Sequence, residues 1–139
     1  MVNHMTPDQA LEVLLDGNQR FVDSTQQHNN HAAARTRTVD GQSPFAGIVR
    51  CADSRVAPEL VFDQSLGELF VCAVAGNLPT TEVIASLEYT VAMLKTPLLV
   101  VMGHSGCGAA DATLAHEADV SALPGHLADL ASQILPAVQ

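Results

Sequence analysis

Three short apolar runs after residue 44 place the tightest constraint on the fold of this chain, because they alternate with segments that have helical patterns. The runs cover residues 45–49, 69–74 and 97–102 and are rich in β-branched and large aliphatic side chains, which predicts buried strands. Residues 58–62 and 80–94 predict helices between them. This order predicts an α/β fold, a mostly parallel β-sheet flanked by helices, with ligand sites beyond the carboxyl ends of the strands.

The residues before the first predicted strand predict a helix followed by a polar arm. Thr6, Pro7 and Gln9 match the cap, the first position and the capping box of a helix. Residues 23–43 carry no sustained period, so we expect an exposed connection that wraps a partner subunit. The helix is expected to end at about Val22, and its apolar stripe consists of Ala10, Leu11, Leu14, Leu15 and Phe21.

The domain organisation follows from the length and from the change of composition near residue 43. We expect one domain over residues 1–139, in which residues 1–43 form the N-terminal helix and arm and residues 44–139 form the α/β core. Two further helices are expected over residues 108–116 and 124–135. Because 47% of the residues are hydrophobic, the chain can bury a packed core.

The charge and the cysteine content argue against several classes of function. The 15 acidic and 6 basic residues give a formal charge of −9, which disfavours nucleic acid or an anionic membrane surface as a partner. No apolar run approaches the roughly 18 residues of a membrane span, and no secretory signal is visible, so we expect a cytoplasmic protein. Its three cysteines lack the spacing of a disulfide framework, which leaves their thiols free for metal binding or catalysis.

Candidate metal ligands follow directly after the first and third predicted strands. Cys51 ends the first strand, and His104 and Cys107 follow the third. Two thiolates and one imidazole suit zinc, which favours tetrahedral sulfur and nitrogen ligands. A set of three protein ligands leaves the fourth position for water, as in catalytic zinc sites. These residues therefore predict a zinc site at the carboxyl edge of the sheet.

Asp53 and Arg55 lie beside the first candidate ligand, two residues apart, and are expected to pair. Such a pair lowers the pKa of the Asp53 carboxyl and holds the carboxylate in one orientation. It can then accept a hydrogen bond from zinc-bound water or ligate zinc itself. A pair that only stabilises the turn is the alternative interpretation.

Other catalytic interpretations of the same residues explain less. Cys72 lies inside the second apolar run and is expected to be a buried hydrophobe. The segment from Gly103 to Cys107 begins like a nucleophile elbow, but Cys107 stands where the final glycine is required, so we reject a serine hydrolase. A Cys107 nucleophile with His104 as base would leave Cys51, Asp53 and Arg55 unexplained.

The residues Cys51-x-Asp53-Ser54-Arg55 and His104-x-x-Cys107 resemble the pattern of the β-class carbonic anhydrases. The resemblance implies that Cys51, His104 and Cys107 hold Zn2+, with water or, in a closed state, Asp53 in the fourth position. It also implies reversible hydration of CO2 to bicarbonate and a proton by zinc-bound hydroxide, which Asp53 orients with Arg55. The similarity covers roughly residues 5–116 and includes residues 41–44, 62–64, 67–70, 75–77 and 86–89.

The resemblance further implies a small substrate pocket at a subunit interface. Gln42, Phe70 and Tyr89 would line this pocket, with the Gln42 amide donating to a substrate oxygen. The expected assembly is a homodimer or a higher homo-oligomer.

Two departures from the family pattern bear on function. Ala73 stands where the family commonly has an arginine in the second strand, which argues against effector control by bicarbonate. Family members usually continue into a further helix and strand, so we expect an uncovered sheet edge, whether the chain is a natural short form or a fragment. CS2 or COS as substrate, and an inactive zinc-stabilised oligomerisation module, are the alternatives. The Asp53 and Arg55 pair argues against the inactive module, since structural zinc does not need it.

Overall fold

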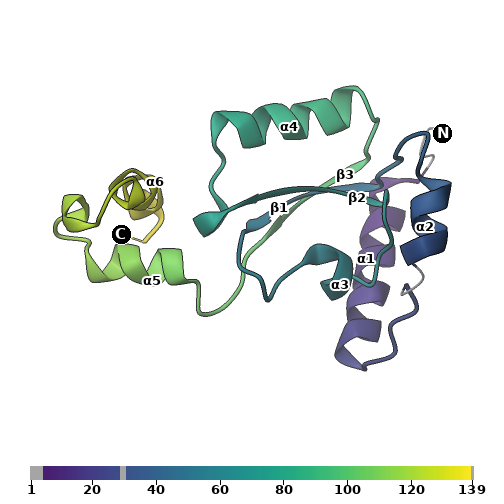
Figure 1. Cartoon of the computed structure of the whole chain (residues 1–139), viewed down its shortest axis with the longest axis horizontal. Coiled ribbons are helices and arrows are strands. Elements are labelled where there is room, and N and C mark those ends of the chain that lie inside the picture. Colours follow the sequence, from purple (N-terminus) through teal and green to yellow (C-terminus); the bar gives the residue numbers. More distant parts are fainter. Residues whose placement is uncertain (1–4, 29–30, 139) are drawn as a thin grey trace.

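A three-stranded parallel sheet forms the centre of the molecule, as a computed structural model shows for residues 5–28 and 31–138. The order β2–β1–β3 places β1 (Ala46–Cys51) between β2 (Leu69–Val74) and β3 (Leu98–Met102) (Figure 1). Both pairings are parallel, with Ala46 opposite Leu69 and Leu98. The predicted α/β fold with a parallel sheet and an N-terminal helix is confirmed. Residues 29 and 30 of the predicted arm lie outside the described residues.

Helices cover both faces of this sheet. The helices α1 (Pro7–Val22) and α3 (Pro58–Val61) lie on one side and α4 (Thr81–Ala92) on the other (Figure 1). Side chains alternate across β1, so Ile48 packs in the core beneath α1 and Val49 packs beneath α4. The N-terminal helix and the two helices predicted between the strands are therefore confirmed to within a few residues.

The N-terminal helix has the predicted cap but not the full predicted stripe. Thr6 Oγ1 accepts from the backbone N–H of Gln9, and the Gln9 side chain accepts from the backbone N–H of Thr6. Ala10 and Leu14 are buried, whereas Leu11, Leu15 and Phe21 are exposed. The buried face of α1 also contains Gly17, which a search for large apolar residues overlooks.

The segment predicted as an irregular arm contains a short helix, α2 (His31–Arg37). The sequence lacks an apolar period there because Ala34 alone among the residues of this helix is buried. The predicted arm is therefore wrong at this point.

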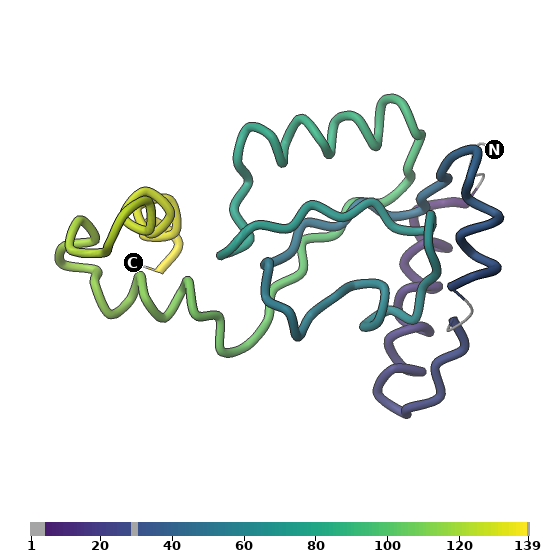
Figure 2. The backbone as a smooth tube through the Cα atoms, viewed as in Figure 1, coloured from purple at the N-terminus to yellow at the C-terminus, as the bar shows by residue number. Residues whose placement is uncertain are grey.

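Two C-terminal helices, α5 (Gly108–Ala115) and α6 (Leu127–Val138), confirm the last two predicted helices. They are joined through the 3₁₀ turn η2 (Val120–Ala122), and a similar turn, η1 (Ala75–Asn77), follows β2. Figure 2 shows the chain leaving the sheet after β3 and forming this helical pair beyond the carboxyl ends of the strands, at the opposite end from α1. In the part of the chain that the structure describes, no helix is long and apolar enough to cross a membrane.

The third strand is an edge strand and is less buried than predicted. Leu99 is 47% exposed and Val101 is 76% exposed, although β1 beside them is almost entirely buried. The two exposed side chains lie on the face that α4 covers only in part, where an apolar groove runs between the helix and Leu99. The expected uncovered sheet edge is therefore present along β3.

Candidate metal centre

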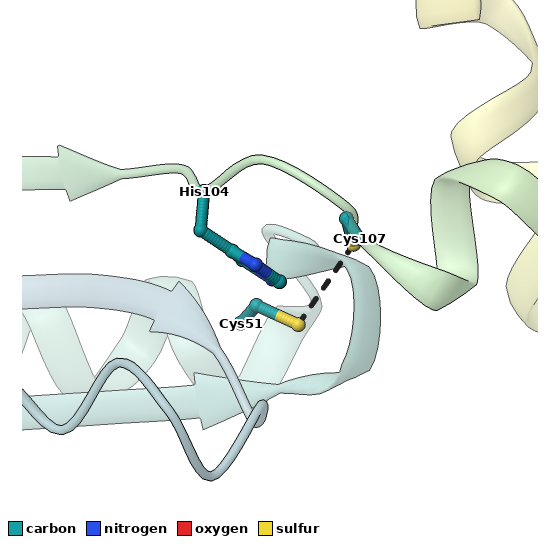
Figure 3. Close-up of side chains that lie close together, drawn as sticks. All are labelled: Cys51, His104 and Cys107. Atoms are coloured by element: carbon teal, nitrogen blue, oxygen red, sulfur yellow. Dashed lines mark hydrogen bonds between the residues drawn. The ribbon is translucent and has the colours of Figure 1, made fainter.

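The three candidate ligands meet at the carboxyl edge of the sheet. Cys51 is the last residue of β1, and His104 and Cys107 follow β3. Because β1 and β3 pair in parallel as far as Arg50 and Met102, their ends lie side by side. Cys107 is also the residue that precedes the first turn of α5. Figure 3 shows the His104 imidazole and the Cys107 side chain both extending toward the Cys51 thiol.

The geometry of this cluster fits a tetrahedral metal. The ligand atoms of Cys51, His104 and Cys107 all lie within 4.8 Å of one another, and the two Sγ atoms are 4.0 Å apart. Zn–S bonds of about 2.3 Å at tetrahedral angles separate two sulfurs by about 3.8 Å. The residues present therefore match zinc in both chemistry and spacing.

The histidine is oriented for metal binding through one nitrogen. His104 Nδ1 donates to the carbonyl oxygen of Ser105 at 3.0 Å. His104 Nε2 is buried and has no hydrogen-bond partner in the described part of the chain. A backbone carbonyl on one ring nitrogen and a free lone pair on the other is the usual arrangement of a metal-binding histidine.

The surroundings of Cys51 favour its thiolate form. Burial by itself raises the pKa of the Cys51 thiol, but interaction with the His104 imidazole and with the backbone N–H groups of Asp53 and Gly76 outweighs burial and lowers the pKa to about 7. Interaction with Cys51 in turn raises the pKa of His104. Since the thiolate is the metal-binding form of cysteine, this environment prepares Cys51 as a ligand.

The Asp53 and Arg55 side chains form the expected pair. Asp53 Oδ1 accepts from the backbone N–H and from Nε of Arg55, both at 2.9 Å, and Oδ2 accepts from Arg55 Nη2 at 2.7 Å. Hydrogen bonds from Arg55 hold the pKa of the Asp53 carboxyl well below its usual range. Arg55 Nη2 also donates to the carbonyl of Gly106 at 3.1 Å. The pair therefore joins the turn after β1 to the loop that carries His104 and Cys107.

Gln42, Phe70 and Tyr89 do not lie beside the metal cluster within one chain. Phe70 is four residues before Val74, the register partner of Cys51, so about 13 Å of strand separates them. Tyr89 on α4 contacts Phe70 with ring centroids 6.0 Å apart. Gln42 precedes β1 and lines a polar cleft of about 520 Å³ at the amino edge of the sheet. The three predicted pocket residues thus lie toward the opposite edge of the sheet from the ligands, and of the three only Phe70 and Tyr89 are shown in contact.

Arg50 is a site residue that the sequence analysis missed. It stands next to Cys51 in β1 and pairs in register with Ala73 of β2. Its Nη1 donates to the carbonyl oxygens of Cys51 at 2.8 Å and of Asp53 at 3.0 Å. A charged residue within a buried strand, directly before a candidate ligand, was the signal that could have identified it.

Together these features define a class of protein: an α/β protein with a Cys-His-Cys cluster that could hold a metal ion at the carboxyl edge of a parallel sheet. The carbonic anhydrase family profile matches residues 46–139. The chain belongs to the β-carbonic anhydrase family.

The most similar curated relatives include two mycobacterial proteins. Carbonic anhydrase 2 of Mycobacterium tuberculosis is 42% identical over 133 residues, which cover 95% of this chain and 64% of the relative. A carbonic anhydrase of Mycolicibacterium smegmatis is 39% identical, with 95% and 65% covered. This chain thus spans slightly less than two thirds of the length of these relatives.

Solved structures show the same fold. A Coccomyxa β-carbonic anhydrase in complex with acetazolamide is 31% identical, with a TM-score of 0.66, and the match covers 89% of this chain and 55% of that one. The β-carbonic anhydrase CcaA is 28% identical, with a TM-score of 0.68 and coverage of 92% and 64%.

Proposed function

We propose that this chain binds Zn2+ through Cys51, His104 and Cys107 and catalyses the reversible hydration of CO2 to bicarbonate and a proton. The observation that carries the proposal is the cluster of three ligand atoms within 4.8 Å, next to the paired Asp53 and Arg55. Zinc in such a site acts as a Lewis acid that lowers the pKa of water from about 15.7 to about 7, which provides a nucleophile at neutral pH.

The remaining roles belong to side chains of this chain. Asp53 stays a carboxylate because Arg55 binds both of its oxygens, so it accepts a hydrogen bond from the attacking hydroxyl group. This hydrogen bond aims a lone pair of the nucleophile at the CO2 carbon. Arg55 fixes the carboxylate and, through Gly106, the second ligand loop. We also propose that Asp53 becomes a fourth ligand in a closed state, which would require it to leave Arg55.

We further propose that the substrate pocket is completed between copies of this chain in a homodimer or a higher homo-oligomer. The support is the placement of Gln42, Phe70 and Tyr89 at the amino edge of the sheet, where they are remote from their own metal cluster. Tyr89 is 48% exposed although it contacts Phe70, so its ring is available to a partner. In such an assembly, Gln42, Phe70 and Tyr89 of each copy lie over the proposed metal centre of the other copy.

The proposal is tested by stopped-flow CO2 hydration with zinc-quantified protein between pH 6.5 and pH 9. We expect about one zinc per chain and a rate that rises with pH. Asp53→Ala should keep its zinc and lose activity about 10- to 100-fold, because the change removes the group that orients the nucleophile. Cys107→Ser should lose both zinc and activity.

The matched control is Asp16→Ala, which removes an exposed carboxylate on α1 and should change neither quantity. An Asp53→Ala protein that hydrates CO2 as fast as the parent would contradict the assigned role. Zinc-loaded parent protein that hydrolyses CS2 or COS but leaves CO2 unchanged would replace the substrate. Zinc-loaded protein inactive on all three would indicate a zinc-stabilised module instead.

A further inference from the structure

Arg50 occupies an unusual place for a charged side chain. It lies on the central strand of the sheet, two residues after Ile48, and therefore on the face that packs against α1. Its register partners are Ala73 on β2 and Met102 on β3. Arg50 is thus flanked on the same sheet face by an alanine and a methionine. The small side chain of Ala73 leaves room beside the guanidinium.

The contacts of Arg50 are made with the turn that follows its own strand. The β1–β3 pairing ends at Arg50, one residue before Cys51. The carbonyl groups of Cys51 and Asp53 lie beyond this pairing, and Arg50 Nη1 donates to both, at 2.8 and 3.0 Å. On the other side of the turn, the backbone N–H of Ala52 donates to the carbonyl of Val74 at 3.0 Å. The turn is therefore fixed both from β2 and from the guanidinium.

Apolar packing alone does not explain why an arginine stands at position 50. Arg50 Nε is buried and has no hydrogen-bond partner in the described part of the chain, and an unpaired buried donor destabilises a fold. A methionine, like its neighbour Met102, would end the apolar row without that cost. What a methionine lacks is the pair of hydrogen bonds to the turn.

We propose that Arg50 is a positioning residue for the metal centre. By fixing the carbonyls of Cys51 and Asp53, it sets where the Cys51 thiolate stands relative to Cys107 and where the Asp53 carboxylate stands relative to both. It acts through the backbone, from the sheet face opposite to the Cys51 thiol, and touches neither metal nor substrate. The inference rests on the proposed zinc site and deepens it.

The test compares Arg50→Met and Arg50→Lys with the parent protein. Zinc affinity is measured by competition with a chromophoric chelator, and ligand geometry by the absorption spectrum of the Co2+-substituted protein. We expect Arg50→Met to weaken zinc binding about 10- to 100-fold, the usual effect of removing a group that holds a metal ligand in place, and to alter the Co2+ spectrum. Arg50→Lys keeps one charged donor near the carbonyls and should lose less.

The matched control is Arg20→Met, which removes another partly buried arginine, bound to Asp63 and remote from the metal centre. It should lower the melting temperature and leave the zinc affinity and the Co2+ spectrum unchanged. If Arg50→Met binds zinc as tightly as the parent with the same spectrum, or if Arg20→Met weakens zinc binding equally, the positioning role is wrong. A parent protein that binds neither Zn2+ nor Co2+ would overturn the proposed function as well.

Discussion

The first and the last helix of the chain are attached to the molecule in different ways. The N-terminal helix α1 lies against the sheet, where its backbone at Gly17 approaches α3 so closely that an added Cβ would stand 1.8 Å from the carbonyl oxygen of Phe62. The C-terminal helix α6 packs on α5 and η1, beyond the end of the sheet (Figure 1). Its contact with η1 is made by Ile134, which packs against Gly76.

Because of this difference, the proposed metal site connects two separately packed parts of the fold. The N-terminal helix shares the core with the strands, so it is fixed whether or not metal is bound. The α5–α6 pair begins immediately after Cys107, and a metal that binds Cys51 and Cys107 ties the start of this pair to β1. Metal binding should therefore stabilise the C-terminal part more than the N-terminal part.

Metal removal should have the largest effect and should separate the two parts. A ligand present at a thousandfold excess over its dissociation constant stabilises the folded state by about 4 kcal/mol. After chelation we expect amide hydrogen exchange within residues 108–138 to accelerate about tenfold or more, because the pair then loses its metal-mediated link to β1. Exchange in residues 10–20 should change far less. Peptide-level exchange measured by mass spectrometry on zinc-loaded and metal-free protein checks this.

Re-addition of Zn2+ is the control and should restore protection in residues 108–138. Equal acceleration in α1 and α6 would show that the two helices unfold as one unit. In that case metal binding would not stabilise the C-terminal part more than the N-terminal part.

Substitution of a helical glycine by alanine should have opposite consequences in the two parts. Gly17→Ala forces α1 away from Phe62 and should destabilise the protein by about 3 kcal/mol. Gly108→Ala, at the first residue of α5, places its Cβ in open space and should be neutral or stabilising by up to about 1 kcal/mol. Urea unfolding of both variants, in the zinc-loaded state, gives the two free energies. A stable Gly17→Ala protein would mean that α1 can move away from α3 at little cost.

The sequence predicted those features that depend on short-range pattern. The spacing of His104 and Cys107 is local, and the rule that parallel strands end at one edge was enough to bring Cys51 next to them. The Thr6 cap and the pairing of Asp53 with Arg55 are also local and were predicted. That these ligands bind zinc stays a prediction.

The features that the sequence did not predict depend on contacts between distant segments. The close approach of the Phe62 backbone requires Gly17, and not Leu15, to face the protein core. The helical periodicity of the sequence does not reveal this contact. The helix α2 buries a single residue, so it leaves no apolar signal. An uncovered edge was expected, but which strand forms it follows from the strand order, which the alternation of strands and helices does not determine.

Asp63 explains how the N-terminal segment is fixed to α3. It is only 2% exposed, and its carboxylate accepts from Arg20 Nε and from the backbone N–H groups of Gln27 and His28, the last two at 3.0 Å. Arg20 lies 43 residues away in the sequence. The C-terminal part offers an exposed acidic residue for comparison, Asp129, whose Oδ2 lies 3.4 Å from His126 Nδ1.

Removing these two carboxylates should give the smallest of the three effects and a distinct pH dependence. Burial raises the pKa of Asp63, but the hydrogen bonds from Arg20, His28 and Gln27 outweigh it and lower the pKa from 3.8 to about 2. The folded protein thus holds this proton less tightly than the unfolded chain. The stabilisation is therefore complete above about pH 4 and is lost as the pH falls through about 2.

Asp63→Asn should cost about 2 kcal/mol at pH 7, whereas Asp129→Asn, which breaks an exposed pair, should cost less than about 1 kcal/mol. The measurement is urea unfolding from pH 7 to pH 2, and the stability difference between parent and Asp63→Asn should shrink below pH 4. A difference that stays constant down to pH 2 would contradict a stabilising contribution from the charge of Asp63.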